Sequence, residues 1–441
     1  MIAANNIETK ITKLDNGIRV VTESVPNTNS AGISILIDAG PQNEAENQTG
    51  LAHLCEHALF LGTNLRDRDQ LSSFIDSSGG NMGGFTAPDY TCFYGHVMQD
   101  YVSYAVDLLG DIIIGSSYPE DLLEREKDVV CQEIQQYSDY PNEIALQATK
   151  RMLWPNDLLS RSVTGSTADV ERLTRANVID FISKNYTPDR IIVAAAGALD
   201  HESIVEQAED AFWTLRGSSP QISHPRAISK GGVSITRMET NQCTISIAIP
   251  VHGITDPRRY ATHLISSLLG GGMSSRLYRN LREQKGLVYS IQSNILSYRR
   301  GGALVIEAIT SPEKLVESIQ LILFELTSLA IWQQPINEEE LWKSRMQMKG
   351  QSQLAVDVIP NRVARLSTQC LFFGHRISDE SMMDQITKLT IPQLNEVALS
   401  VLLEGLSKLT IAIAGPIDCD GSVYNDLSEL HECYSSIASS G

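Results

Sequence analysis

Hydrophobic and polar residues follow recognisable periods along the first half of the chain. Residues 32–38 are apolar at every second position, residues 90–97 are rich in aromatic and β-branched side chains, and 191–197 is a continuous apolar run. These patterns are typical of β-strands. Because strands and helical patterns mix without strict alternation, we expect an α+β fold. Helical spacing and helix-boundary signals predict helices at 49–61, 68–77, 99–114, 119–138, 143–153, 174–185 and 201–215.

A short pattern of the first half recurs in the second half. Residues 195–200 (Ala-Ala-Gly-Ala-Leu-Asp) are similar to residues 413–418 (Ile-Ala-Gly-Pro-Ile-Asp), at an offset of 415 − 197 = 218 residues. The recurrence predicts a duplicated chain of two similar halves. Applied to positions 53, 56 and 57, the same offset reaches Gly271, Ser274 and Ser275, which form no metal-ligand set.

The length of the chain sets the number of domains. A chain of 441 residues is expected to form two domains of about 200 residues each. Polar, loop-forming residues gather near the middle of the sequence. We therefore predict a first domain at 1–216, a linker at 217–232 and a second, homologous domain at 233–441 that lacks the metal motif.

The candidate chemistry begins with two histidines four positions apart. On a helix, His53 and His57 project from the same side, so both imidazoles can bind one metal ion. Glu56 lies between them, within reach of a water molecule on that ion. The pattern His-x-x-Glu-His is typical of metal-assisted peptide hydrolysis.

A catalytic zinc ion normally takes three protein ligands, so a third must come from elsewhere. Glu126 and Glu133 are seven residues apart in the helix predicted at 119–138, and they share one face. Glu133 is the candidate ligand, and Glu126 would support the site from behind. An acidic stripe is also typical of a solvated helix face, so spacing alone leaves both interpretations open.

Together these residues resemble the pitrilysin-type inverzincins. The small two-domain branch, which includes mitochondrial processing peptidase and its bacterial relatives, is the most similar. The zinc motif is followed by Glu133 after 133 − 57 = 76 residues, and residues 50–52 and 59–63 beside the motif agree with the family. Residues 270–277 and 281–290 match its pattern in the second half. The resemblance covers about residues 10 to 418.

The resemblance implies a fold, a metal and a set of roles. It implies two domains, each with a mostly antiparallel sheet packed with helices, in the processing-peptidase-like metallohydrolase architecture. It implies a Zn²⁺-dependent endopeptidase in which Glu56 is the general base and Glu126 the supporting acid. By the same resemblance the zinc ligands are His53, His57 and Glu133, and the residues that contact the substrate or the oxyanion are Arg282 and Tyr289.

The resemblance also implies that the substrate lies extended along a sheet edge near the metal. In this chain that edge is expected around Gly83 and Gly84, where the family usually has Asn-Ala. Two glycines loosen a strand and remove a side-chain donor, so peptide affinity or cleavage preference would differ. Cys55 and Cys131 are expected to be packing residues rather than ligands.

Charge and composition restrict the partners. A net charge of −18 disfavours nucleic acids and anionic membranes, and it suits basic peptides. The sequence has no apolar stretch of the roughly 18 residues that span a bilayer, and it begins without a secretory or mitochondrial leader pattern. Seven scattered cysteines fit free thiols, so we expect a cytoplasmic protein.

Three functions agree with these residues. The first is an endopeptidase that cuts extended peptides or small unfolded polypeptides in a chamber closed by a dimer, either a homodimer or a heterodimer with a related subunit. The second is a peptide-binding or scaffold subunit of a heterodimeric processing protease. The third is a dedicated protease that matures leader peptides. Intact metal residues favour the enzymes over the scaffold.

Overall fold

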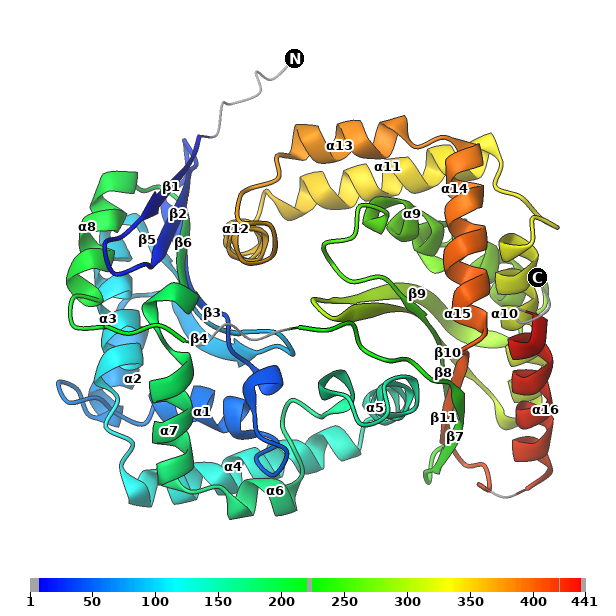
Figure 1. The fold of residues 1–441 in the computed structure, drawn as a ribbon, viewed down its shortest axis with the longest axis horizontal. Helices are drawn as coiled ribbons and strands as arrows, with labels where there is room; N and C mark the ends of the chain where they lie inside the picture. The colour runs from blue at the N-terminus through cyan, green and yellow to red at the C-terminus, as the bar shows by residue number, and fades with distance from the viewer. Residues whose placement is uncertain (1–7, 220–223, 420, 438–441) are drawn as a thin grey trace. The chain divides into compact units, whose positions relative to one another are not determined.

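The computed structural model describes residues 8–219, 224–419 and 421–437 (Figure 1). The outer ends of both predicted domains and part of the predicted linker therefore lie outside the described residues. The chain forms two compact units. The first contains Met1–Ile134, Ser162–Ser223 and Gln353–Ile377, and the second contains Gln135–Arg161, His224–Ser352 and Ser378–Gly441.

The first unit is built on a six-stranded sheet. Its strand order is β1-β2-β6-β3-β5-β4, and only the β2–β6 pair is parallel. This order leaves β4 as an edge strand. The strands are β1 (Thr9–Lys13), β2 (Arg19–Ser24), β3 (Ser30–Ile37), β4 (Asn81–Thr86), β5 (Thr91–Met98) and β6 (Ile191–Gly197).

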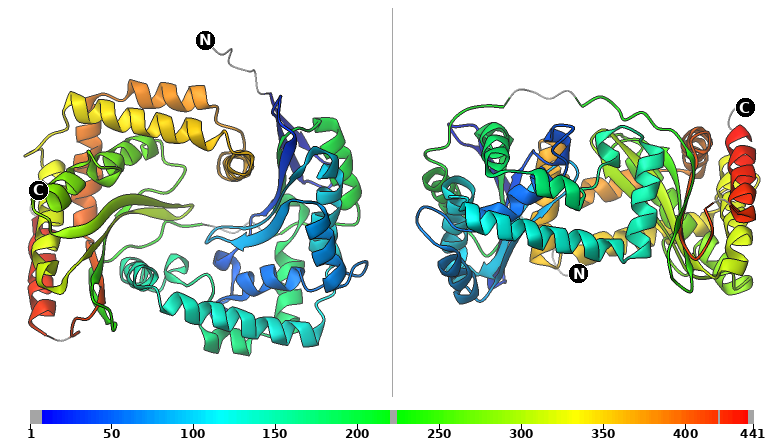
Figure 2. Two further views of the ribbon diagram at one scale, coloured as in Figure 1. Left: turned by 180° about the vertical axis from the view of Figure 1, so that it is seen from behind. Right: turned by 90° about the horizontal axis from the view of Figure 1, so that it is seen from below.

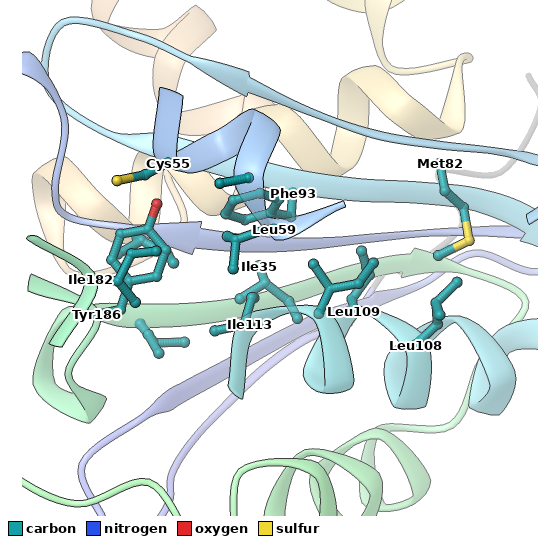
Figure 3. Close-up of a cluster of buried hydrophobic side chains, with 14 of the residues drawn as sticks. Ile35, Cys55, Leu59, Met82, Phe93, Leu108, Leu109, Ile113, Ile182 and Tyr186 are labelled. Atoms are coloured by element: carbon teal, nitrogen blue, oxygen red, sulfur yellow. The ribbon is translucent and has the colours of Figure 1, made fainter. Parts of the chain in front are cut away.

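A layer of helices covers one face of this sheet. Alternate residues of β3, including Ile35, point into a core shared with the helices, where Leu59 and Leu109 pack (Figure 3). The helices are α1 (Leu51–Leu59), α2 (Arg68–Ser77), α3 (Val102–Gly115), α4 (Glu120–Ser138), α6 (Thr167–Arg172), α7 (Arg175–Asn185) and α8 (His201–Ala211).

A helix from the second half of the sequence, α12 (Ile359–Phe373), covers the opposite face of the same sheet. Its apolar stripe packs against Leu36 and Ile192, which point away from the other helices. The buried carboxylate of Glu23, only 2 % exposed, binds the guanidinium groups of Arg362 and Arg376 and so fixes the helix to β2.

The second unit repeats this plan around a five-stranded sheet (Figure 2). Its strand order is β7-β11-β8-β10-β9, and only β7–β11 is parallel. The strands are β7 (Gly232–Arg237), β8 (Cys243–Val251), β9 (Val288–Tyr298), β10 (Gly301–Thr310) and β11 (Thr410–Gly415). The helices are α9 (Arg259–Gly270), α10 (Leu315–Ala330), α11 (Glu338–Ala355), α13 (Asp379–Lys388), α14 (Ile391–Ala398), α15 (Glu404–Leu406) and α16 (Ser422–Ile437).

One more helix of the second unit comes from the first half of the sequence. Helix α5 (Pro141–Leu153) packs on β8, β11 and β7, and the Thr149 hydroxyl lies 2.8 Å from the Ser246 hydroxyl on β8. The two halves have thus exchanged a helix, because each sheet has a second apolar face to cover. Residues 135–161 and 353–377 therefore belong to the opposite unit from the one that a contiguous division of the chain assigns.

The predicted α+β class, with two similar and mostly antiparallel domains, is confirmed. The prediction that one offset of 218 residues relates all of the two halves is wrong. An offset of 218 relates the central strands β6 and β11, where Ala195 corresponds to Ile413. Ala195 pairs with Ile33 of β3, and Ile413 pairs with Ile245 of β8. The offset between β3 and β8 is therefore 245 − 33 = 212. Loops of unequal length change the offset, so the counterpart of α1 is α9, which ends at Gly270.

Across the parts of the chain that the structure covers, every helix is too short or too polar to cross a membrane.

Candidate metal centre

The metal motif lies on α1, and two features stabilise the beginning of this helix. Gly50 precedes the helix with a φ of 89°, a conformation that favours glycine. The carboxylate of Glu44 accepts hydrogen bonds from the backbone N–H groups of Gly50 and Ala52, at 3.2 and 2.8 Å. A carboxylate at this end also complements the helix dipole. Both features stabilise the orientation of α1 at the end where the motif begins.

Three side chains from α1 and α4 meet at one point. The Nε2 atoms of His53 and His57 each lie 3.6 Å from Oε2 of Glu133, and one candidate ligand atom from each residue lies within 4.8 Å of the others. Among the described residues this is the one such cluster of ligating groups. Two imidazoles and a carboxylate match the ligand set of a catalytic zinc ion, so the donors fit the metal.

Glu126 supports His57 from the side away from Glu133. Its Oε1 atom lies 2.9 Å from Nδ1 of His57, which leaves Nε2 of that ring facing the metal position. Burial acts to lower the pKa of His57, but hydrogen bonds to Glu126 and Glu133 raise it to about 9. Arg68 on α2 lies 3.6 Å from the other oxygen of Glu126.

His53 has different surroundings. Burial, followed by the charge of His57, lowers its pKa to about 4. Its buried Nδ1 atom has no hydrogen-bond partner in the covered part of the chain. The neutral imidazole, with Nε2 directed at Glu133, is the form that binds a metal. The two rings lie edge to face, with centroids 4.6 Å apart.

Glu56 is held beside this cluster by the edge strand β4. The Thr86 hydroxyl donates a hydrogen bond of 2.8 Å to Oε2 of Glu56. A Cβ atom at Gly84 would lie 2.9 Å from Cγ of Glu56, so this glycine provides the space in which the carboxylate lies. Burial raises the pKa of Glu56, against the effect of the Thr86 hydrogen bond. A raised pKa suits a group that must take up and return a proton.

Two family models match consecutive segments of the chain, and the second segment begins within the first unit. Residues 19–167 match the family described as insulinase (peptidase family M16), and residues 172–348 match the peptidase M16 inactive domain. An uncharacterized zinc protease of Mycobacterium tuberculosis is 31% identical over 410 residues, covering 92% of each chain. The chain belongs to the M16 peptidase family.

Two further relatives support this family. An uncharacterized zinc protease of Bacillus subtilis is 28% identical and covers 91% of this chain and 97% of its own. The crystal structure of a peptidase M16 inactive domain from Pseudomonas fluorescens has a TM-score of 0.85 at 19% identity, covering 94% of this chain and 99% of that one. The structural likeness supports the fold, while the sequence relatives carry the zinc protease name.

The remaining predicted residues of this M16 family member lie on elements of both units. Gly83 and Gly84 are on β4, which is an edge strand as expected. Arg282 lies in a π-helix, Tyr278–Gln284, of the second unit, and Tyr289, 70 % exposed, lies at the start of β9. π-Helical turns are rare and frequently occur at functional sites.

Sequence reasoning missed several supporting residues. Thr86 orients Glu56, and Arg68 contacts Glu126. Tyr278 accepts a hydrogen bond from Arg282 and places its ring 4.8 Å below the guanidinium carbon. The one signal for Tyr278 was its position four residues before Arg282. Thr86 could have been identified because it is two residues from Gly84 in a strand and so faces the same side. No feature of the sequence indicated Arg68.

Cys55 is not part of the metal cluster. Its sulfur is fully buried and lies 3.9 Å from the carbonyl oxygen of Val178 on α7. The side chain therefore packs between helices, away from Glu133, as a small apolar residue does. This agrees with the packing role that the sequence predicted for it.

Proposed function

We propose that the protein is a zinc-dependent endopeptidase. His53, His57 and Glu133 are the zinc ligands, Glu56 is the general base, and Glu126 holds His57. The observation that carries the proposal is the approach of three ligating atoms to within 4.8 Å, with the carboxylate of Glu56 held beside them by Thr86. The zinc protease names of the sequence relatives support the same metal and reaction class.

Zinc bound by these three residues would polarise the scissile carbonyl group and lower the pKa of water toward about 7. Glu56 accepts the proton of the attacking water and returns it to the leaving amine. The raised pKa of Glu56 favours that uptake at neutral pH. Thr86 donates to one oxygen of Glu56, which leaves the other oxygen for the proton.

The second unit contributes to the proposed reaction through Arg282 and Tyr289. Both carry hydrogen-bond donors that stabilise the negative oxygen as it forms. We propose that the active enzyme is a dimer, a homodimer or a pair with a related subunit, whose chamber encloses peptides or small unfolded polypeptides. Basic, extended peptides are the favoured substrates because of the net charge of −18.

The substitution Glu56→Gln tests this function. It keeps the size of the side chain and a hydrogen bond to Thr86, but it removes the base. Cleavage of a quenched basic peptide should fall by about 10²- to 10⁴-fold, while zinc content stays at the wild-type level. Removal of zinc with a chelator should abolish cleavage, and added zinc should restore it. Unchanged cleavage by the zinc-loaded Glu56→Gln variant would reject the mechanism.

A further inference from the structure

The π-helix that carries Arg282 presents side chains in two directions. Tyr278 and Arg282 are four residues apart and contact each other: Arg282 donates a hydrogen bond to the phenol oxygen, and its guanidinium carbon lies 4.8 Å from the ring centroid. Arg276 and Asn280, each two residues earlier, reach instead to α11 and α10. Residues four apart share one side of a helix and residues two apart do not, so the second pair anchors the turn from behind.

Asn280 reaches a buried carboxyl group, that of Glu325 on α10. Glu325 is only 2 % exposed, and the other buried residues of this helix include Ile322 and Leu326. Nδ2 of Asn280 donates a hydrogen bond of 2.6 Å to Oε1 of Glu325, while Oε2 has no hydrogen-bond partner within the described part of the chain. Burial raises the pKa of Glu325, against the effects of Asn280 and of the nearby charge of Arg276. A buried carboxyl group is costly, so a core built for packing alone would carry an apolar residue here.

Arg276 fixes the beginning of the same segment. Its Nε and Nη2 atoms bind the two carboxylate oxygens of Glu340 on α11, at 2.7 and 2.8 Å. Nη1 and Nη2 also donate to the backbone carbonyl oxygens of Gln334 and Pro335. A bidentate pair of this kind sets direction as well as distance. The segment is therefore attached to α11 and to α10, and Arg282 lies two residues beyond the second attachment.

We propose that Asn280 and Glu325 are positioning residues for the reaction, which hold the π-helix so that Tyr278 can align the guanidinium of Arg282. The hydrogen bond from Asn280 to Glu325 fixes the backbone, and the phenol of Tyr278 fixes the side chain. A guanidinium has five N–H donors, so the contact with Tyr278 leaves others for the negative oxygen that forms during cleavage. Donors that are already oriented need no rearrangement as that charge develops. The proposal rests on the proposed function and adds to it how the donor of the second unit is held.

A double-mutant cycle separates positioning from a purely structural role. Asn280→Ala should lower kcat by about tenfold and change KM by less than about twofold, because the misplaced donor acts in the transition state. Arg282→Ala should lower kcat by about 10²-fold or more. In the Arg282→Ala background, adding Asn280→Ala should cost less than about twofold further, since the group that it positions is absent. A structural defect would lower kcat by the same factor in both backgrounds.

Two variants at Glu325 give a second readout. Glu325→Gln keeps an oxygen that accepts the hydrogen bond from Asn280, so kcat should stay within about threefold of the wild-type value. Glu325→Leu removes the acceptor and should reproduce the loss seen in Asn280→Ala, again only where Arg282 is present. If Glu325→Leu does not fold, Asn280→Ala still decides the question, because its side chain is only half-buried.

His431→Ala is the matched control in the same unit. It removes a side-chain hydrogen bond of 2.9 Å between α16 and the carbonyl oxygen of Leu409, and it should keep the wild-type kcat and KM. An unchanged kcat in Asn280→Ala, or equal losses with and without Arg282, would overturn the positioning role. Full kcat in Arg282→Ala would instead reject Arg282 as a donor, and cleavage by zinc-loaded Glu56→Gln would reject the proposed function, so the failures are distinguishable.

Discussion

The two units share a sheet plan, yet the contact between the helix and the edge strand differs between them. In the first unit, Glu56 of α1 meets Thr86 of β4 as a carboxylate bound by a hydroxyl. In the second, Ser266 of α9 meets Ser293 of β9, with the two hydroxyl oxygens 2.9 Å apart. The same junction carries a proton acceptor in one copy and a neutral packing contact in the other. The duplicated fold thus supplies a frame, and the chemistry depends on a few side chains placed in it.

Removing a metal ligand from the first unit should have the largest effect, measured as a loss of zinc affinity. His57→Ala should weaken zinc affinity by more than about 100-fold, because only two of the three metal ligands remain. This loss exceeds the one expected for a residue that contacts a ligand without binding the metal. His263→Ala, in the corresponding helix α9, should leave zinc affinity unchanged. Competition with a chromophoric chelator measures both. Equal losses in the two variants would mean that the units do not differ in this way.

The exchanged helices allow a second comparison, with stability as the readout. Glu23→Gln removes the buried charge that pairs with Arg362 and Arg376, and should lower the free energy of unfolding by about 3–5 kcal/mol because two largely covered cations lose their charged partner. Thr149→Val, which removes the hydroxyl that anchors α5, should cost about 1–3 kcal/mol. Urea unfolding measures both variants. A smaller cost for Glu23→Gln than for Thr149→Val would contradict this ranking.

Within the metal centre, Glu126→Gln should weaken zinc affinity by about 10- to 100-fold, since Glu126 orients a ligand without binding the metal. Glu124→Gln is the control on the same helix: its carboxylate pairs with Lys127 and faces solvent. That variant should keep the wild-type affinity. If the two variants behave alike, the hydrogen bond from His57 to Glu126 does not support the site.

The smallest expected effect is a proton released on metal binding. With a pKa of about 9, His57 is protonated in the metal-free protein at about pH 7.5, and zinc must displace the proton on Nε2. Zinc affinity should therefore fall as the pH is lowered below 9. Calorimetry in buffers of different ionisation enthalpy should count about one proton. Glu126→Gln, which lowers the pKa of His57, should reduce that count; an unchanged count would contradict the assigned cause.

Much of the fold was predictable, because the hydrophobic periodicity that indicates each strand or helix is local in the sequence. The runs 32–38, 90–97 and 191–197 became β3, β5 and β6 with boundaries shifted by no more than two residues. The exchange of α5 and α12 was not predictable. Their apolar stripes indicate that each helix is buried, but not against which sheet. Which sheet they cover depends on contacts between residues far apart in sequence.

The candidate site was also predictable only in part. Helical spacing placed His53 with His57, and Glu126 with Glu133, but only the packing of α1 against α4 brings the two pairs together. The space that Gly84 gives to Glu56 depends on how closely β4 approaches α1, and no periodicity encodes that distance. In the sequence Gly83-Gly84 departs from the family's pattern, but only the strand in place shows that Gly84 faces Glu56 and Gly83 faces Tyr94.

Zinc K-edge X-ray absorption of the loaded wild-type protein tests the central claim most directly, because it reports the atoms bound to the metal. We predict two imidazole nitrogens and a carboxylate oxygen at about 2.0–2.2 Å, without sulfur. The same spectrum should lose one imidazole in His57→Ala. A sulfur ligand at about 2.3 Å, or a spectrum unchanged in that variant, would contradict the assignment of His53, His57 and Glu133.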